Sequence, residues 1–141
     1  MEKPTFVYRI DIATTPERLW EALTSGDFLA KYWYGRRFRT DWKVGSPMQT
    51  LTPEGGVDWD GQVLAYDPPR LLSYTFQIVG FQKRSSRVEF ELAPRGKVVR
   101  LTLRHYDIEE RCVEGISDAW PAFCSTVKSL LETGRPLELA E

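Results

Sequence analysis

The sequence predicts an α+β domain in which a curved antiparallel sheet wraps a long C-terminal helix. Three observations carry this prediction. Several segments alternate apolar and polar residues, turn-forming residues separate them, and an apolar stripe of helical period ends the chain. The length suits one domain over residues 1–141, with a core large enough to fold without a disulfide or metal.

The first elements are a strand and two short helices. Residues Phe6–Ile12 alternate apolar and polar side chains, as a half-buried strand does. Residues 14–17 then provide a capping hydroxyl, a proline and an acid, which together favour a helix start. Residues 25–27 interrupt this helix, and we expect Asp27 to cap a second short helix over 28–33.

From about residue 34 to residue 107 the chain reads as successive strands, about six or seven with the first. The clearest ones, 72–78, 87–92 and 99–105, alternate so regularly that one face of the sheet must be covered and the other wet. On the wet face, we expect Glu89 and Glu91 to pair across strands with Arg100. The turns between strands are predicted at Val44–Pro47, Pro53–Gly56, Asp67–Arg70 and Pro94–Lys97.

The last element is a long helix that covers the sheet. Asp118 is suited to cap its start, which places Pro121 in the first turn, where a missing N–H costs little. Gly134 is suited to end it. The apolar stripe between these signals contains Ile116, Trp120, Phe123, Val127, Leu130 and Leu131.

Composition and charge exclude several classes of partner and site. A net charge of −1 gives no electrostatic reason to bind nucleic acid or an anionic membrane, and no apolar run is long enough to span one. Without a signal-peptide pattern, the two separated cysteines are expected to be reduced thiols in a cytoplasmic protein. One histidine and two cysteines do not make a zinc site, so we expect no metal or cofactor.

The functional candidates lie on the covered face. Aromatic residues make up 13% of the chain, with five tryptophans, and a curved sheet with one helix is expected to leave a cavity that these side chains border. The same residues are also what a filled core would contain. The predicted ligand-binding set is Trp33, Arg36, Phe38, Trp42, Trp59, Tyr74, Phe76, Phe90, Leu103, His105, Trp120 and Phe123.

Two polar members of this set have specific expected roles. His105 shares strand parity with Leu103, so its ring faces the covered side, where it would contact a ligand, act as a base or be a satisfied core residue. Arg36 shares parity with Phe38 and Trp42, which would place it at the cavity mouth to hold a ligand's carboxylate or phenolate.

Motifs along nearly the whole chain resemble the START-like helix-grip superfamily, also called SRPBCC. Within it, the chain is similar to the family named for activators of heat-shock-protein ATPase. The resemblance implies a helix-grip fold with a deep pocket between helix and sheet. The motifs include Ala13-x-x-Pro16-Glu17-x-x-Trp20-x-Ala22-Leu23, Trp42-x-Val44-Gly45-Ser46, Gly61-x-Val63-Leu64-x-x-Asp67-Pro68-Pro69-Arg70-x-Leu72 and Leu130-Leu131-Glu132-Thr133-Gly134.

Three functions are compatible with these residues. The first is a non-catalytic protein that binds or sequesters a hydrophobic small molecule. The second is a cyclase or dehydratase type of enzyme that uses the same cavity with His105 as general base. The third is a domain that engages a chaperone or another protein, and an open edge strand would also support a homodimer.

Overall fold

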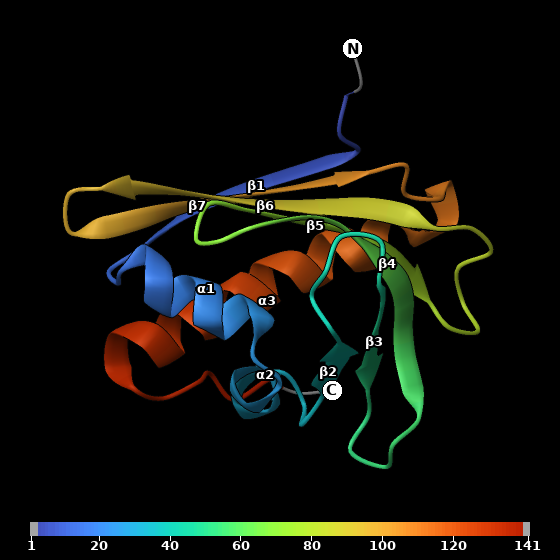
Figure 1. Cartoon of the computed structure of the whole chain (residues 1–141), viewed down its shortest axis with the longest axis horizontal. Helices are drawn as coiled ribbons and strands as arrows, with labels where there is room; N and C mark the ends of the chain where they lie inside the picture. The colour runs from blue at the N-terminus through green and yellow to red at the C-terminus, as the bar shows by residue number, and fades with distance from the viewer. Residues whose placement is uncertain (1–2, 140–141) are drawn as a thin grey trace.

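The computed structural model describes residues 3–139. Figure 1 shows one curved sheet with the helices gathered on its inner side. In chain order the elements are β1 (Phe6–Ile12), α1 (Pro16–Thr24), α2 (Gly26–Tyr32), β2 (Arg37–Thr40), β3 (Pro47–Leu51), β4 (Val57–Asp67), β5 (Leu71–Ile78), β6 (Ser86–Arg95), β7 (Val98–Tyr106), the 3-10 turn η1 (Glu110–Cys112) and α3 (Val113–Thr133).

The seven strands form one antiparallel sheet in the order β1-β7-β6-β5-β4-β3-β2. In Figure 1, β1, β7 and β6 run across the top, whereas β4, β3 and β2 turn downward on the right, so the sheet encloses α3 from two sides. This arrangement confirms the predicted α+β class, the strand number, the two short helices and the long C-terminal helix. All four predicted turns overlap the connections between strands, although Pro47, Asp67, Pro94 and Arg95 belong to the strands themselves.

The sheet bends where β4 crosses β5, and Gly61 permits the bend. A Cβ added at Gly61 would lie 2.0 Å from the carbonyl oxygen of Thr75. The backbone N–H of Gln62 donates to the Thr75 hydroxyl at 2.8 Å, which holds the two strands at this close approach. A little further along β4 the register shifts between Val63 and Ala65, and such irregularities increase the local bend and twist.

The two short helices are capped by hydroxyl side chains. The Thr15 hydroxyl accepts from the backbone N–H of Arg18 at 3.2 Å, as the sequence predicts. The cap predicted for the second helix is wrong, because the N-cap residue is Ser25, whose hydroxyl accepts from Phe28 N–H at 3.4 Å. Asp27 instead lies within the first turn of α2 and pairs with Arg37 at 2.5 Å.

The predicted start of the long helix is also wrong. α3 begins at Val113, no side chain caps it, and both Asp118 and Pro121 lie inside it. Pro121 cannot donate to the carbonyl four residues earlier, yet the helix continues, because the buried side chains of Cys112 and Ile116 extend the apolar stripe past the local start signal. Its end is as predicted: Gly134 has φ 81° and its N–H donates to Leu130.

The inner face of the sheet is buried and the outer face carries ion pairs. Leu101, Leu103 and His105 on β7 are all fully buried, which confirms the predicted strand parity. The predicted partner of the β6 acids is wrong, since Arg104, rather than Arg100, contacts both Glu89 at 3.1 Å and Glu91 at 3.0 Å. Arg104 lies directly opposite Glu89, whereas Arg100 lies opposite Ala93 and pairs with Asp11 on β1.

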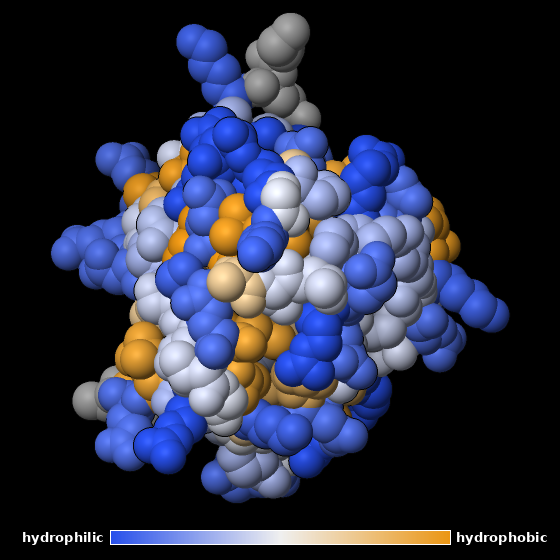
Figure 2. Space-filling model, turned by 90° about the vertical axis from the view of Figure 1, so that its left-hand side faces the viewer, coloured by the Kyte–Doolittle hydropathy of each residue, from blue (hydrophilic) through white to orange (hydrophobic). Residues whose placement is uncertain are grey.

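The surface carries mixed polarity. On the side drawn in Figure 2, hydrophobic side chains form small patches that polar and charged residues separate. Within residues 3–139, no helix is both long enough and apolar enough to cross a membrane.

Candidate functional site

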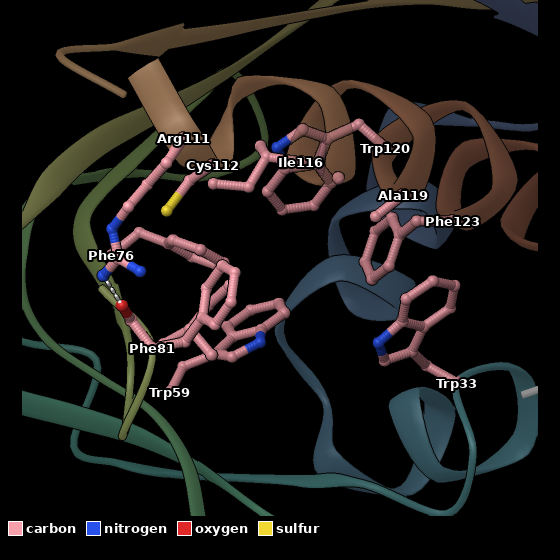
Figure 3. A pocket seen from close by; sticks show the side chains of 12 residues that line it. Trp33, Trp59, Phe76, Phe81, Arg111, Cys112, Ile116, Ala119, Trp120 and Phe123 are labelled. Atoms are coloured by element: carbon pink, nitrogen blue, oxygen red, sulfur yellow. Dashed lines mark hydrogen bonds between the residues drawn. The ribbon is translucent and has the colours of Figure 1, made fainter. Parts of the chain in front are cut away.

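A cavity of about 310 Å³ lies between the first half of α3 and the ends of β4 and β5. Figure 3 shows Trp33 and Phe123 on one side of it, and Trp59, Phe76 and Phe81 on the other. The full lining is Trp33, Trp59, Phe76, Ile78, Phe81, Arg111, Cys112, Gly115, Ile116, Ala119, Trp120 and Phe123. Its volume lies at the small end of the range for ligand pockets, roughly 300–1,000 Å³.

Large rings in tilted and edge-to-face contact form the walls of the cavity. The ring centroids of Trp59 and Phe76 lie 4.6 Å apart, those of Trp120 and Phe123 5.2 Å apart, and those of Trp33 and Phe123 5.3 Å apart. Ring pairs at these separations attract one another beyond the area that they bury, so neighbouring rings stabilise the walls.

The cavity stays open because the side of α3 that faces its mouth carries very small residues. Gly115 and Ala119 are spaced four apart, which places them on one face of the helix, and both are exposed. A Cβ added at Gly115 would meet nothing within 4 Å. Larger side chains at these two positions would project into the opening.

A second, shallower depression of about 480 Å³ continues outward from the cavity. It shares Trp33, Trp59, Ile78, Gly115 and Ala119 with the inner cavity, so the two form one continuous space. The outer depression is more polar than the inner cavity. Its own lining residues are Tyr34, Arg36, Asp58, Asp118 and Ala122.

The polar rim is organised by an ion pair. The Nε of Arg36 lies 2.6 Å from Oδ2 of Asp58, and the two side chains are only 20% and 23% exposed. The guanidinium of Arg36 also lies over the ring of Tyr34, 5.5 Å from its centroid. Arg36 is therefore at the mouth, where the sequence predicts it, but its charge is already neutralised by a carboxylate of the chain.

His105 lies behind the cavity wall and is fully buried. The indole Nε1–H of Trp120 donates to Nδ1 of His105 at 2.9 Å. Because Nδ1 accepts, the proton of the neutral ring is on Nε2, which donates to the hydroxyl of Ser86 at 2.7 Å. Burial disfavours the charged ring and lowers the pKa of His105 to about 3.

The hydrogen-bond network continues from His105 to the loop beside the cavity. Ser86 donates from its hydroxyl to the carbonyl of Phe76 at 2.9 Å. The Nε2 amide group of Gln82, which is also buried, donates to the Ser86 hydroxyl at 3.3 Å, and its Oε1 accepts from Ile78 N–H at 2.8 Å. The network thus joins a cavity wall on α3 to the β5–β6 loop.

The β5–β6 loop supplies the outer lip of the cavity. Phe81 projects from it and is 50% exposed. Arg111 of η1 lies over the Phe81 ring, 5.1 Å from its centroid, and donates to the carbonyl oxygen of Phe81 (Figure 3). Glu109 accepts from the backbone N–H groups of Lys83 and Arg84 at 2.7 and 2.9 Å and contacts Arg111 at 3.4 Å. The lip is therefore fixed by polar contacts.

The sequence-predicted residues divide into those that line the cavity and those that do not. Trp33, Trp59, Phe76, Trp120 and Phe123 line it. Outside this lining lie Arg36, which belongs to the outer depression, and the core residues Phe38, Trp42, Tyr74, Phe90, Leu103 and His105.

Trp42 shows why the alternation of side chains along a predicted strand misplaces some of the predicted ligand-binding residues. β2 extends only over Arg37–Thr40, so the parity drawn from residue 34 to residue 42 does not hold. Trp42 has φ 56°, and its indole N–H donates to the carbonyl of Thr24 at 3.0 Å. Its ring stacks on Tyr66 at a centroid distance of 5.9 Å, away from the cavity lining.

The cavity lining also contains residues outside the predicted ligand-binding set, namely Ile78, Phe81, Arg111, Cys112, Gly115, Ile116 and Ala119. The small residues carried a usable signal, because Gly115 and Ala119 are spaced four apart beside a helical apolar stripe. Phe81 and Arg111 lie in segments without periodicity, so no pattern indicated them.

The two cysteines are free and buried. Burial raises the pKa of Cys124 to about 12, so its thiol stays protonated at neutral pH. Within residues 3–139 no group of three or more His, Cys, Asp or Glu side chains is arranged to hold a metal ion.

Comparisons with solved structures show the same fold in other proteins. The protein MLL2253 from Mesorhizobium loti is 27% identical, with a TM-score of 0.76 over 90% of this chain and 97% of that one. CalU16 from Micromonospora echinospora is 20% identical, with a TM-score of 0.75 over 93% of this chain and 75% of that one. Aha1 from Colwellia psychrerythraea, described as a dimer in solution, is 22% identical, with a TM-score of 0.76 over 92% and 96%.

A search of curated protein sequences found no match. The family described as "Activator of Hsp90 ATPase homolog 1-like protein" (AHSA1), in contrast, matches residues 13–132. That match covers most of the chain and includes the two short helices, strands β2 to β7 and all of α3 except its last residue, whereas β1 precedes it. The chain belongs to the AHSA1 family, within the START-like (SRPBCC) superfamily.

Proposed function

We propose that this protein binds a small hydrophobic molecule, with its aromatic part in the inner cavity and its polar end in the outer depression. The single observation that carries this proposal is the cavity itself: an open space of about 310 Å³ walled by aromatic rings. Close-packed interiors leave few voids larger than a water molecule, so a space of this size among aromatic side chains favours a ligand.

The small residues of α3 support the same proposal. A glycine inside a helix costs about 1 kcal/mol relative to alanine. Gly115 lies inside α3, and an alanine there would meet no steric obstacle. Among the described residues, no packing contact requires a glycine at position 115. A ligand that occupies the open space beside Gly115 would account for it.

Catalysis by His105 as general base has less support. Both ring nitrogens already have protein partners, Trp120 and Ser86, and His105 does not line the cavity. A base must reach the proton that it abstracts within hydrogen-bond distance or through one water. The burial that lowers the pKa of His105 to about 3 also makes the ring a weak base at neutral pH.

A homodimer is a second proposal, independent of the ligand. β1 lies at one edge of the sheet and pairs only with β7 among the described strands. Phe6 and Tyr8 stack along its inner side at a centroid distance of 6.5 Å. Edge strands offer unpaired backbone groups to a second copy. Sedimentation at several concentrations tests this, and a monomer throughout would contradict it.

Thermal melting against a panel of one- and two-ring aromatic molecules tests the ligand proposal. A ligand at about 100 times its dissociation constant stabilises the fold by about 2.7 kcal/mol. Ala119→Leu, which places a larger side chain on the wall shared by both compartments, should abolish the stabilisation. Ala93→Leu makes the same change at an exposed alanine on β6 outside the lining and should leave it intact. A panel without any stabilising compound would contradict the proposal.

A further inference from the structure

We infer that the ligand's polar end is a positively charged amine rather than a carboxylate or phenolate. This inference rests on the proposed function and names the chemical class that the outer depression selects. It reverses the role expected for Arg36 from the sequence. Three observations carry it: the charges of the rim, the aromatic faces beside them, and the compensation of every nearby cation.

Among residues 3–139, the rim contains one cation and two carboxylates. Arg36 and Asp58 neutralise each other at 2.6 Å. Asp118 lines the same depression from α3, and within residues 3–139 no side chain forms an ion pair or hydrogen bond with its carboxylate. The rim therefore holds one unmatched negative charge next to the opening, which attracts a cationic group and repels an anionic one.

A carboxylate ligand would have to compete for Arg36. The pair that Arg36 forms with Asp58 is about four-fifths buried on both sides. Separating such a pair leaves Asp58 partly desolvated without its counter-ion, and this costs more than an exposed pair would. An amine ligand leaves the pair intact.

The faces of two tryptophan rings also favour an amine over an anionic head group. Trp33 and Trp59 line both the inner cavity and the outer depression. The face of an indole ring carries negative potential, so it attracts a cation and disfavours an anion. A ligand amine that lies between these rings and Asp118 would meet favourable charge on each side.

The cations of the inner cavity do not cancel this preference. Arg111 lines the cavity, but it is engaged by Glu109 at 3.4 Å and by the carbonyl of Phe81. The N-terminus of α3 carries the positive end of its helix dipole, and Glu114 in the first turn opposes it. Asp118 therefore remains the unmatched charge at the site.

Calorimetric titration with three matched probes tests the inference: naphthylethylamine, naphthylethanol and naphthylacetate, which differ in head group and charge. At neutral pH the amine should bind at least about ten-fold more tightly than the acetate. The affinity of the alcohol should lie between those two affinities. Asp118→Asn should lower the affinity for the amine about three- to five-fold and leave the affinity for the alcohol unchanged. Glu21→Gln, which removes an exposed carboxylate of α1 outside both linings, should change neither.

The outcomes separate the two proposals. If the alcohol binds and the acetate binds as tightly as the amine, the head-group inference is overturned and the proposed function stands. The inference also fails if the amine is preferred to the same degree after Asp118→Asn. If none of the three probes binds, the head-group inference and the proposed aromatic cavity site are both overturned.

Discussion

The indole N–H of Trp120 donates to Nδ1 of His105 at 2.9 Å, and this bond joins the long helix to β7 directly behind the cavity wall. It fixes the orientation of a tryptophan that faces the cavity on one side and the polar network on the other. The only histidine of the chain is therefore a positioning residue, which holds a wall rather than touching a ligand.

Replacing Trp120 by Phe should destabilise the fold by about 1–2 kcal/mol more than replacing Trp20 by Phe. Both tryptophans are buried, at 3% and 7% exposure, so the loss of ring area is similar. Among the described residues 3–139, the indole N–H of Trp20 has no hydrogen-bond partner, whereas that of Trp120 donates to Nδ1 of His105. Urea unfolding of both variants measures the difference, and equal costs would show that the bond contributes nothing.

The buried His105 should make the fold less stable in mild acid. Its pKa is about 3 when folded and 6.5 when unfolded, so between these values the unfolded chain binds a proton that the folded chain does not. Stability should therefore fall by about 1.4 kcal/mol for each pH unit below 6.5.

The single histidine gives this prediction a direct check. Its ring signal in an NMR titration should stay that of the neutral ring from about pH 7 to about pH 4.5. A midpoint near 6.5 would show an exposed, unconstrained ring. Between about pH 6.5 and pH 5 ordinary carboxylates stay ionised, so the loss of stability in that window belongs to His105.

The two glycines near the ends of α3 should change stability in opposite directions when replaced by alanine. Gly115→Ala should stabilise the fold by up to about 1 kcal/mol, because the helix gains propensity and the new Cβ meets open space. Gly134→Ala should destabilise by about 1 kcal/mol, since φ 81° there is strained for alanine. Thermal unfolding of the pair measures both, and a loss of stability in Gly115→Ala would mean that the cavity wall is closed.

Gly61→Ala should be the most damaging glycine substitution in the sheet. Its Cβ would lie 2.0 Å from a backbone oxygen, so β4 and β5 would have to move apart at the bend. We expect a cost of about 3 kcal/mol or a failure to fold. Gly56→Ala is the control, with an ordinary 3.4 Å contact to a flexible hydroxyl. Equal stability of the two variants would contradict the role given to Gly61.

The strands were predictable because they alternate, and their hairpins were predictable because proline and glycine mark the turns. Parity placed Leu103 and His105 on the buried face correctly. Local cap signals were less reliable: Asp118 and Pro121 look like a helix start, but the burial of Cys112 and Ile116 against the sheet extends α3 past them.

The candidate site was predictable only in part, because a cavity depends on where side chains leave space as well as on which side chains line it. The large rings such as Trp59 and Trp120 were recognisable as inward residues. The pairing of Arg36 with Asp58, and the open space beside Gly115, arise from contacts between segments far apart in the chain. The four-residue spacing of Gly115 and Ala119 indicates a helix face of small residues, but no pattern in the sequence encodes the ion pair or the cavity that this face borders.

The five indole N–H signals of the protein offer the most direct test of the cavity as a ligand site. Trp33, Trp59 and Trp120 line the cavity, whereas Trp20 and Trp42 lie outside it. Titration of naphthylethylamine into ¹⁵N-labelled protein should shift the first three signals and leave the other two in place. Unchanged signals from all five, or shifts confined to Trp20 and Trp42, would contradict a ligand in this cavity.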